Sequence, residues 1–391
     1  MKTARTQATF VSPIVESRRW LAGVTFADDQ PLLNLSQAAP ADAPPEGLRQ
    51  AMAEAVLNQT SAHLYGPVLG NEDLRAALAD QMSRHYDAPI AASNIAITSG
   101  CNQAFAATIQ SLCAEGDAVI LPTPWYFNHK MWLDMQGVTT LPLPVGEGML
   151  PEVAQAEALI TDRTRAIALV TPNNPCGVEY PAALLDAFFD LAQRHGLTLI
   201  VDETYRDFDS RNGAPHRLLQ REDWQETLVH LYSFSKAYRL TGHRVGAIAA
   251  GPDRLFEMEK FLDTVTICPA QLGQIGAKWG IENLDQWLAG ERAEILDRRA
   301  AIQDGFAPLA AKGWQLLGLG AYFAYVAHPY EESSDVLAQR LLREAGMLLL
   351  PGTMFTPTEA PEGHRQFRIA FANVDRAGIA DMISRLADFD G

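Results

Sequence analysis

The chain has 391 residues, of which 48% are hydrophobic and 20% charged, and its formal net charge is −16. This length exceeds what one hydrophobic core usually supports and predicts two domains. The negative charge argues against a nucleic-acid surface and a basic membrane patch, and no apolar run approaches the ~20 residues that span a bilayer.

The N-terminal sequence and the cysteines predict a cytoplasmic protein. Residues 1–10 include basic residues but no apolar run follows them, so we identify no secretory signal. The cysteines lie far apart, without a CxxC pair or histidines at ligand spacing; they are Cys101, Cys113, Cys176 and Cys268. We expect reduced thiols, and neither a disulfide framework nor a metal site.

The first part of the chain predicts an arm that leads into helices. A strand is expected at 32–36 and is followed by a rigid passage, Pro40–Pro45. One helix is expected at 46–57 and another from Asn71, a favoured cap residue. The expected division is an N-terminal arm (1–40) that is part of the small domain, a large domain (41–280) and a small C-terminal domain (281–391).

From about residue 94, short apolar strands alternate with helices. The strands are expected at 95–98, 118–121, 166–170, 198–201, 228–232 and 245–250, and the helices at 102–113, 125–136, 181–195 and 254–263. Strands that are apolar throughout favour a mostly parallel sheet covered on both faces, which makes a three-layer α/β domain. In such folds ligands bind where the strands end.

The C-terminal part predicts a small α+β domain after a long helical region at 275–309. Its strands are expected at 321–326, 347–350 and 367–371, and its helices at 333–345 and from Asp375. Residues 318–323 resemble part of a dinucleotide-binding motif but lack its third glycine. They are therefore interpreted as a glycine turn before a strand, against a nicotinamide oxidoreductase.

The segment 233–246 carries the strongest chemical signal. Lys236 lies between two strands, and a lysine that is partly desolvated near Arg244 can form a Schiff base with an aldehyde. Hydroxyls at Ser233 and Ser235, with the Arg244 guanidinium, supply the donors that a phosphate needs. Ordinary solvated charges are the blander alternative, but the combination predicts a phosphorylated aldehyde cofactor.

Two further loops could bind the same cofactor. Gly100 precedes a helix whose first residues, Cys101 and Asn102, could offer backbone amides to a phosphate. Asn174 follows another strand and can donate its amide N–H to a phenolate-like oxygen. Alone, the Gly100 loop is weak evidence, because a glycine between a strand and a helix usually just forms a turn, and a turn-forming role is also the alternative for Asn174. Tyr126 offers a ring that could stack on a planar cofactor, although core packing is the commoner role of such aromatics.

Three more polar residues complete the candidate site. Asp202 ends an apolar strand, where a carboxylate could keep a pyridine nitrogen protonated, and Tyr205 could reach a neighbouring ring oxygen. A helix-capping aspartate is the alternative. Arg368, from the small domain, could bind a substrate carboxylate with both of its terminal nitrogens.

These motifs, in this order, resemble those of class I/II aminotransferases, which are pyridoxal-phosphate enzymes of fold type I in the aspartate aminotransferase superfamily. The resemblance extends from about residue 32 to 385. It consists of SxSK before RxG (233–246), NPxG (174–177), DExY (202–205) and GxxQA (100–104). It implies a seven-stranded-type sheet, a pyridoxal 5′-phosphate cofactor and a homodimer with shared active sites.

The resemblance also implies residue roles. Lys236 would hold the cofactor as an internal aldimine, and Asp202 and Tyr205 would act with it in catalysis. The cofactor-binding set would be Gly100, Cys101, Asn102, Tyr126, Asn174, Asp202, Tyr205, Ser233, Ser235, Lys236 and Arg244, with Tyr65 reaching the phosphate of the neighbouring subunit. The substrate would contact Ala38, Asn174 and Arg368.

The chain departs from the family pattern at three positions. Glycine is common at the position of Ala38, tryptophan at that of His243, and threonine or serine at that of Cys176. None of these changes removes a catalytic group.

The implied function is transfer of an amino group from an L-amino acid to a 2-oxo acid in amino acid metabolism, for instance in biosynthesis. A carbon–sulfur β-lyase of the same fold is the alternative, because it uses the same lysine, aspartate and arginines. A regulatory protein with an aminotransferase-like domain would need a DNA-binding module, for which the first forty residues are too short.

Overall fold

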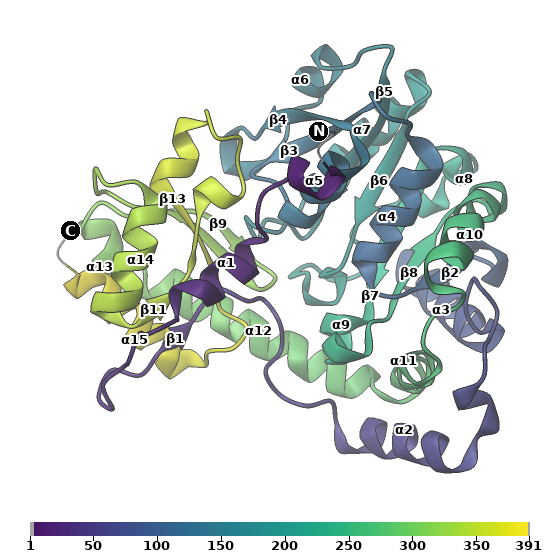
Figure 1. The fold of residues 1–391 in the computed structure, drawn as a ribbon, viewed down its shortest axis with the longest axis horizontal. Coiled ribbons are helices and arrows are strands. Elements are labelled where there is room, and N and C mark those ends of the chain that lie inside the picture. Colours follow the sequence, from purple (N-terminus) through teal and green to yellow (C-terminus); the bar gives the residue numbers. More distant parts are fainter. Residues whose placement is uncertain (1–3, 390–391) are drawn as a thin grey trace.

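The computed structural model describes residues 4–389, and its largest element is a seven-stranded sheet with the order β2-β8-β7-β6-β5-β3-β4 (Figure 1). The strands are β2 (Ile95–Thr98), β3 (Ala118–Thr123), β4 (Thr139–Pro144), β5 (Thr164–Val170), β6 (Thr198–Asp202), β7 (Leu228–Ser233) and β8 (Gly246–Ala249). Only β8 is antiparallel to its neighbours, β2 and β7. The predicted mostly parallel sheet is confirmed.

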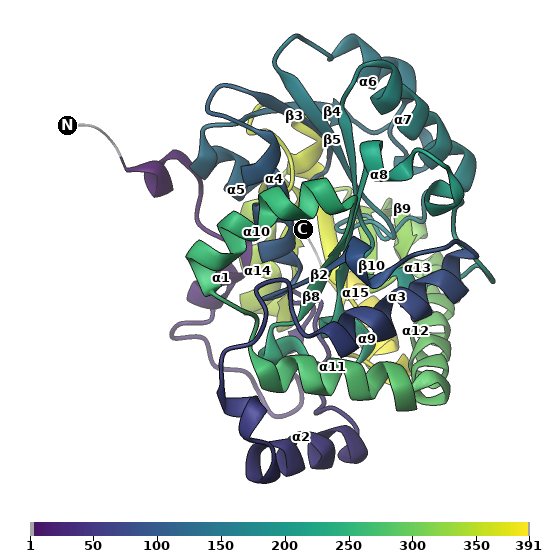
Figure 2. The ribbon, with the colours of Figure 1, turned by 90° about the vertical axis from the view of Figure 1, so that its right-hand side faces the viewer.

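Hydrophobic cores lie on both faces of this sheet, because its strands are apolar on both sides. Ile97 belongs to one core, whereas the adjacent Ala96 belongs to the other. The helices of this part are α2 (Glu46–Asn58), α3 (Glu72–Tyr86), α4 (Cys101–Leu112), α5 (Phe127–Gln136), α6 (Val153–Ala158), α7 (Ala182–Arg194), α8 (Trp224–Thr227), α9 (Phe234–Ala237), α10 (Pro252–Thr266) and α11 (Gln271–Asn283). Figures 1 and 2 both place α2 at the lower edge of the molecule, beside α11.

A smaller antiparallel sheet, with the order β12-β13-β10-β9, follows the long helix α12 (Asp285–Gly305). The remaining elements of this part are α13 (Ala307–Ala311), β9 (Gln315–Gly320), β10 (Phe323–Ala327), α14 (Ser334–Ala345), β11 (Met347–Leu348), β12 (Leu350–Pro351), β13 (Gln366–Ala370) and α15 (Arg376–Asp388). The N-terminal segment joins it, since β1 (Leu33–Asn34) pairs in parallel with β11. Helix α1 (Pro13–Trp20) lies at the front of the molecule in Figure 1 and at its left-hand side in Figure 2.

Several sequence expectations were wrong or incomplete. β4 was not expected; it contains Pro142 and Pro144 and forms at the edge of the sheet, where proline is tolerated. Asn71 is the N-cap residue of α3, as expected, but its side chain makes no capping hydrogen bond; its Nδ2 donates to Gln271 Oε1 at 2.7 Å. The short helices α1 and α6 were also not expected.

The glycines expected to form a turn lie instead in β9. A Cβ at Gly318 would stand 2.4 Å from the Cys176 carbonyl, and one at Gly320 would stand 2.4 Å from the Gly177 carbonyl. The glycines therefore allow the 173–177 loop to pack directly on this strand. Within residues 4–389, no helix combines the length and apolar character needed to cross a membrane.

Candidate active site

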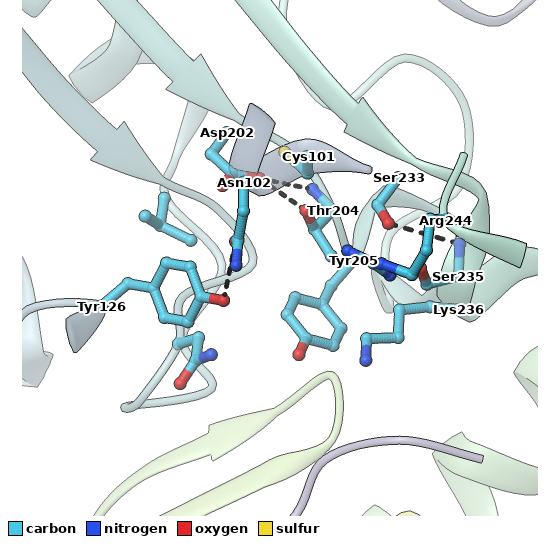
Figure 3. Close-up of a pocket in the computed structure, with 12 residues that line it drawn as sticks. Cys101, Asn102, Tyr126, Asp202, Thr204, Tyr205, Ser233, Ser235, Lys236 and Arg244 are labelled. Atoms are coloured by element: carbon cyan, nitrogen blue, oxygen red, sulfur yellow. Dashed lines mark hydrogen bonds between the residues drawn. The ribbon is translucent and has the colours of Figure 1, made fainter. Parts of the chain in front are cut away.

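A cavity of about 130 Å³ opens at the carboxyl ends of β5, β6 and β7, the edge where polar loops were expected to meet (Figure 3). Its lining consists of Cys101, Asn102, Tyr126, Val170, Asn174, Asp202, Thr204, Tyr205, Ser233, Ser235, Lys236 and Arg244. The cavity thus brings together residues that are separated by more than a hundred positions in the sequence.

Lys236 lies in the one-turn helix α9, whose N-cap residue is Ser233. Its amine donates a hydrogen bond to the Ala38 carbonyl at 2.6 Å. Burial, with repulsion from Arg244 and Arg368, lowers the pKa of Lys236 to about 8. At pH 7 roughly one amine in ten is therefore neutral, the form that attacks a carbonyl.

Asp202 is buried at the end of β6, and its Oδ1 accepts hydrogen bonds from Thr204 N at 3.0 Å and Thr204 Oγ1 at 2.7 Å. His129 Nε2 lies 3.2 Å from Oδ2, within ion-pair range but outside regular hydrogen-bond geometry. Burial alone would raise the pKa of Asp202, but interactions with His129 and Thr204 outweigh it and hold the pKa below its usual value. The carboxylate is thus ionised and can pair with a cation.

The Tyr205 hydroxyl is in its protonated form. Burial, with the nearby Tyr126, raises the pKa of Tyr205 well above its usual value. The phenol can therefore donate a hydrogen bond to an anionic oxygen in the cavity.

Arg368 reaches the site from β13 of the smaller sheet. It is buried; its Nη1 donates to Asn174 Oδ1 at 3.0 Å, and its Nη2 donates to the Ser36 carbonyl. Because a guanidinium only donates, the atom of Asn174 that faces Arg368 must be the oxygen Oδ1. The amide nitrogen Nδ2 is therefore the atom at the opposite side of the Asn174 amide group, where it can donate a hydrogen bond. Arg368 Nε makes no hydrogen bond with any residue of 4–389, so it can still donate to a ligand.

The end of the cavity beside α4 has a guanidinium and backbone N–H donors, which suit an anion. Gly100 has φ +86°, and a Cβ there would lie 2.4 Å from Arg244 Nη2, so only glycine lets the guanidinium approach this turn. The first amides of α4, at Cys101 and Asn102, have no acceptor within the helix. The Ser233 hydroxyl adds a further polar group to this lining.

These donors fit pyridoxal phosphate. Arg244, the first amides of α4 and the hydroxyls of Ser233 and Ser235 would hold the phosphate. Asp202 is suited to the pyridine nitrogen, and Lys236 to the aldehyde.

The remaining predicted residues have different positions. Ala38 contacts Lys236 through its carbonyl. Tyr126 points into the cavity, where its hydroxyl donates to Asn102 Oδ1 at 3.2 Å (Figure 3). Tyr65 does not line the cavity and is 81% exposed. Nothing in the structure explains His243 at a position where tryptophan is common.

Sequence reasoning missed Thr204, Val170 and His129. Thr204 belongs to the DExY motif and orients the Asp202 carboxylate, so its hydroxyl beside that residue was an available signal. Val170 offered no such signal, because it is simply the last residue of a strand that reads as apolar. His129 reaches Asp202 because α5 packs near the end of β6. No local sequence pattern predicts this arrangement.

Comparisons with known proteins place most of the chain in one family. The family described as aminotransferase class I and II matches residues 30–386. The chain is 28% identical to the aromatic aminotransferase ISS1 of Arabidopsis thaliana, over 90% of this chain and 88% of that protein. It is 30% identical to the arginine–pyruvate transaminase AruH of Pseudomonas aeruginosa, over 85% and 84% of the two chains.

Solved structures have the same fold. A mutant aspartate aminotransferase of Thermus thermophilus superposes with a TM-score of 0.88 at 24% identity, covering 99% of both chains. A putative kynurenine aminotransferase of Saccharomyces cerevisiae gives a TM-score of 0.89 at 19% identity, covering 100% of both. The family match and the aminotransferases of Arabidopsis thaliana and Pseudomonas aeruginosa favour transamination over the lyase alternative, and the chain belongs to the class I and II aminotransferase family.

Proposed function

We propose that the cavity binds pyridoxal 5′-phosphate and transfers the amino group of an L-amino acid to a 2-oxo acid. The observation that carries this proposal is the combination of a lysine with a lowered pKa and an ionised, buried aspartate in one cavity, which also has an anion-binding end. When bound, the cofactor would supply the aldehyde that accepts the amino group and an electron-poor ring.

Each side chain then has a defined task. Arg368 binds the substrate carboxylate and so fixes the α-carbon near Lys236. Lys236 Nζ accepts the proton from the α-carbon of the substrate and donates a proton back later in the reaction. With the cofactor bound, Asp202 would keep the nitrogen of its ring protonated, and Tyr205 and Asn174 would donate hydrogen bonds to the oxygen on that ring.

We propose a homodimer that shares its active sites, the arrangement that the resemblance of the sequence motifs implies. Apolar side chains are exposed on α2, the Tyr65 loop and the end of α10, namely Leu57, Leu64, Tyr65, Val265 and Ile267. The loop and the end of α10 adjoin, because Gly66 N lies 3.4 Å from Cys268 Sγ. A second copy covering this surface would place Tyr65 near the partner's phosphate site.

Three further assignments belong to the same proposal. The chain is divided into an arm (1–40), a large domain (41–280) and a small domain (281–391). The enzyme acts in the cytoplasm, where scattered thiols stay reduced, and takes part in amino acid biosynthesis.

The direct test adds single L-amino acids to purified enzyme loaded with pyridoxal phosphate, without an acceptor. We expect the absorbance of the bound cofactor to change in one turnover, with one equivalent of 2-oxo acid released. Continuous release of pyruvate and ammonia from a sulfur amino acid would establish the lyase instead. No absorbance from bound cofactor, even with pyridoxal phosphate in excess, would refute the cavity assignment.

A further inference from the structure

Gln103, the glutamine of the GxxQA motif, has no place in the cofactor-binding set. It does not line the cavity, and it lies in the first turn of α4, three residues after the N-cap residue Gly100. Its Oε1 accepts a hydrogen bond from Ser99 N at 2.6 Å, and its Nε2 donates to Thr266 Oγ1. Both ends of this one side chain are therefore engaged within the protein.

The turn between β2 and α4 carries four consecutive backbone amides, which divide into two pairs. The Gly100 amide donates to the Thr98 carbonyl at 2.8 Å, and the Ser99 amide donates to Gln103. The first two amides of α4 have no hydrogen-bond acceptor in the described part of the chain. Because buried backbone donors in proteins are almost always paired, a phosphate in the cavity would complete this second pair.

The turn is packed closely from its other side by β8. A Cβ at Gly246 would stand 2.6 Å from both Cys101 N and the carbonyl carbon of Gly100. The turn therefore lies between the backbone of β8 and the side chain of Gln103. Ser99 is half-buried, so without Gln103 its amide would need water or another acceptor. Rotation of the turn to reach one would move the first amides of α4 away from the cavity.

The contact with Thr266 prepares Gln103 for this task. Thr266 is the last residue of α10, which packs along α4 (Figure 2). A free glutamine side chain samples many rotamers, and a hydrogen bond that fixes its far end reduces the entropy lost when Oε1 binds the Ser99 amide. Helix α10 thus helps to hold the turn through Gln103.

We propose that Gln103 is a positioning residue, which holds the turn before α4 in the conformation that binds the phosphate group of the cofactor. It acts through the turn and does not contact the phosphate. This proposal rests on the proposed function, because it takes pyridoxal phosphate as the ligand. Loss of Gln103 should therefore weaken binding of the phosphorylated cofactor and leave binding of unphosphorylated pyridoxal almost unchanged.

The test titrates the full-length protein, freed of cofactor, with pyridoxal 5′-phosphate and with pyridoxal, and follows the absorbance of the bound compound. Gln103→Met keeps the length of the side chain but removes both hydrogen bonds. We expect its Kd for pyridoxal phosphate to rise about 10-fold, as for the loss of one or two hydrogen bonds, and its Kd for pyridoxal to change less than about 2-fold.

Two further variants complete the series. Thr266→Val removes only the far contact of Gln103, so the Kd for pyridoxal phosphate should rise about 3-fold. Gln110→Met is the matched control, because Gln110 is an exposed glutamine on the same helix and makes no hydrogen bond with the described residues. It should change neither Kd. Circular dichroism of each variant establishes that it is folded.

The ratio of the two Kd values separates the possible outcomes. A folded Gln103→Met protein that binds both compounds equally more weakly, or binds both as the wild type does, overturns the proposal. Equal affinity of the wild type for both compounds also overturns it, since the turn then recognises no phosphate. If Gln103→Met does not fold, the same ratio in Thr266→Val decides. A wild type that binds neither compound contradicts the proposed function itself.

Discussion

Replacing Lys236 by methionine should stabilise the cofactor-free protein. The pKa of this lysine falls from 10.5 to about 8, a difference of 2.5 units, which corresponds to about 3.4 kcal/mol at ~1.36 kcal/mol per unit. Methionine removes that cost but also the hydrogen bond to the Ala38 carbonyl, worth about 1 kcal/mol. The net gain at pH 7 is therefore about 2 kcal/mol.

The pH dependence identifies the cause. Below pH 8 the Lys236 amine is charged in both the folded and the unfolded protein, so the full cost of burying its charge is present there. It fades as the pH rises from about 8 to 10.5, because the unfolded amine then also becomes neutral. Urea denaturation of both proteins at pH 7 and pH 10 measures the difference.

The matched control is Lys278→Met. Interactions with Glu282 and Asp73 raise the pKa of Lys278, so removing it should give no gain at pH 7. A Lys236→Met protein that is no more stable than the wild type, or one whose gain persists at pH 10, would refute the reasoning.

Three further substitutions have defined outcomes. Asp202→Asn should retain the fold but lower turnover about 10²–10³-fold, since the ring nitrogen loses its charged partner; equal turnover would exclude this role. Arg368→Ala should raise the KM for amino acids about 100-fold with little effect on cofactor absorbance, and an unchanged KM would point to another carboxylate partner. Gly177→Ala should cost about 2 kcal/mol or more in urea denaturation, because φ is +78° and the new Cβ would stand 2.5 Å from the Phe323 carbonyl; wild-type stability would contradict this geometry.

The parts of the fold that the sequence predicted are those with strong local patterns. The strands β5, β6 and β7 are mostly apolar, and each ends in a polar residue or is followed directly by one, so both their burial and the edge that carries the site could be deduced. Asp202 and Lys236 were identifiable because each follows such a strand within a short motif. The glycine before α4 was a similar local signal.

The parts that were missed depend on contacts between distant segments. β4 contains prolines and is a strand only because β3 offers it a partner. The glycines of β9 are explained only by the loop at 173–177 that packs on them. His129 likewise lies in no recognisable sequence motif, and its proximity to Asp202 follows from the packing of α5.

The most direct test of the central claim is to locate the cofactor on the chain. Holoenzyme is reduced with borohydride, which fixes lysine-bound pyridoxal phosphate, and its peptides are analysed by mass spectrometry. The account predicts the phosphopyridoxyl group on Lys236 alone. An active enzyme that carries the group on Lys130 or another lysine, or on none, would contradict it.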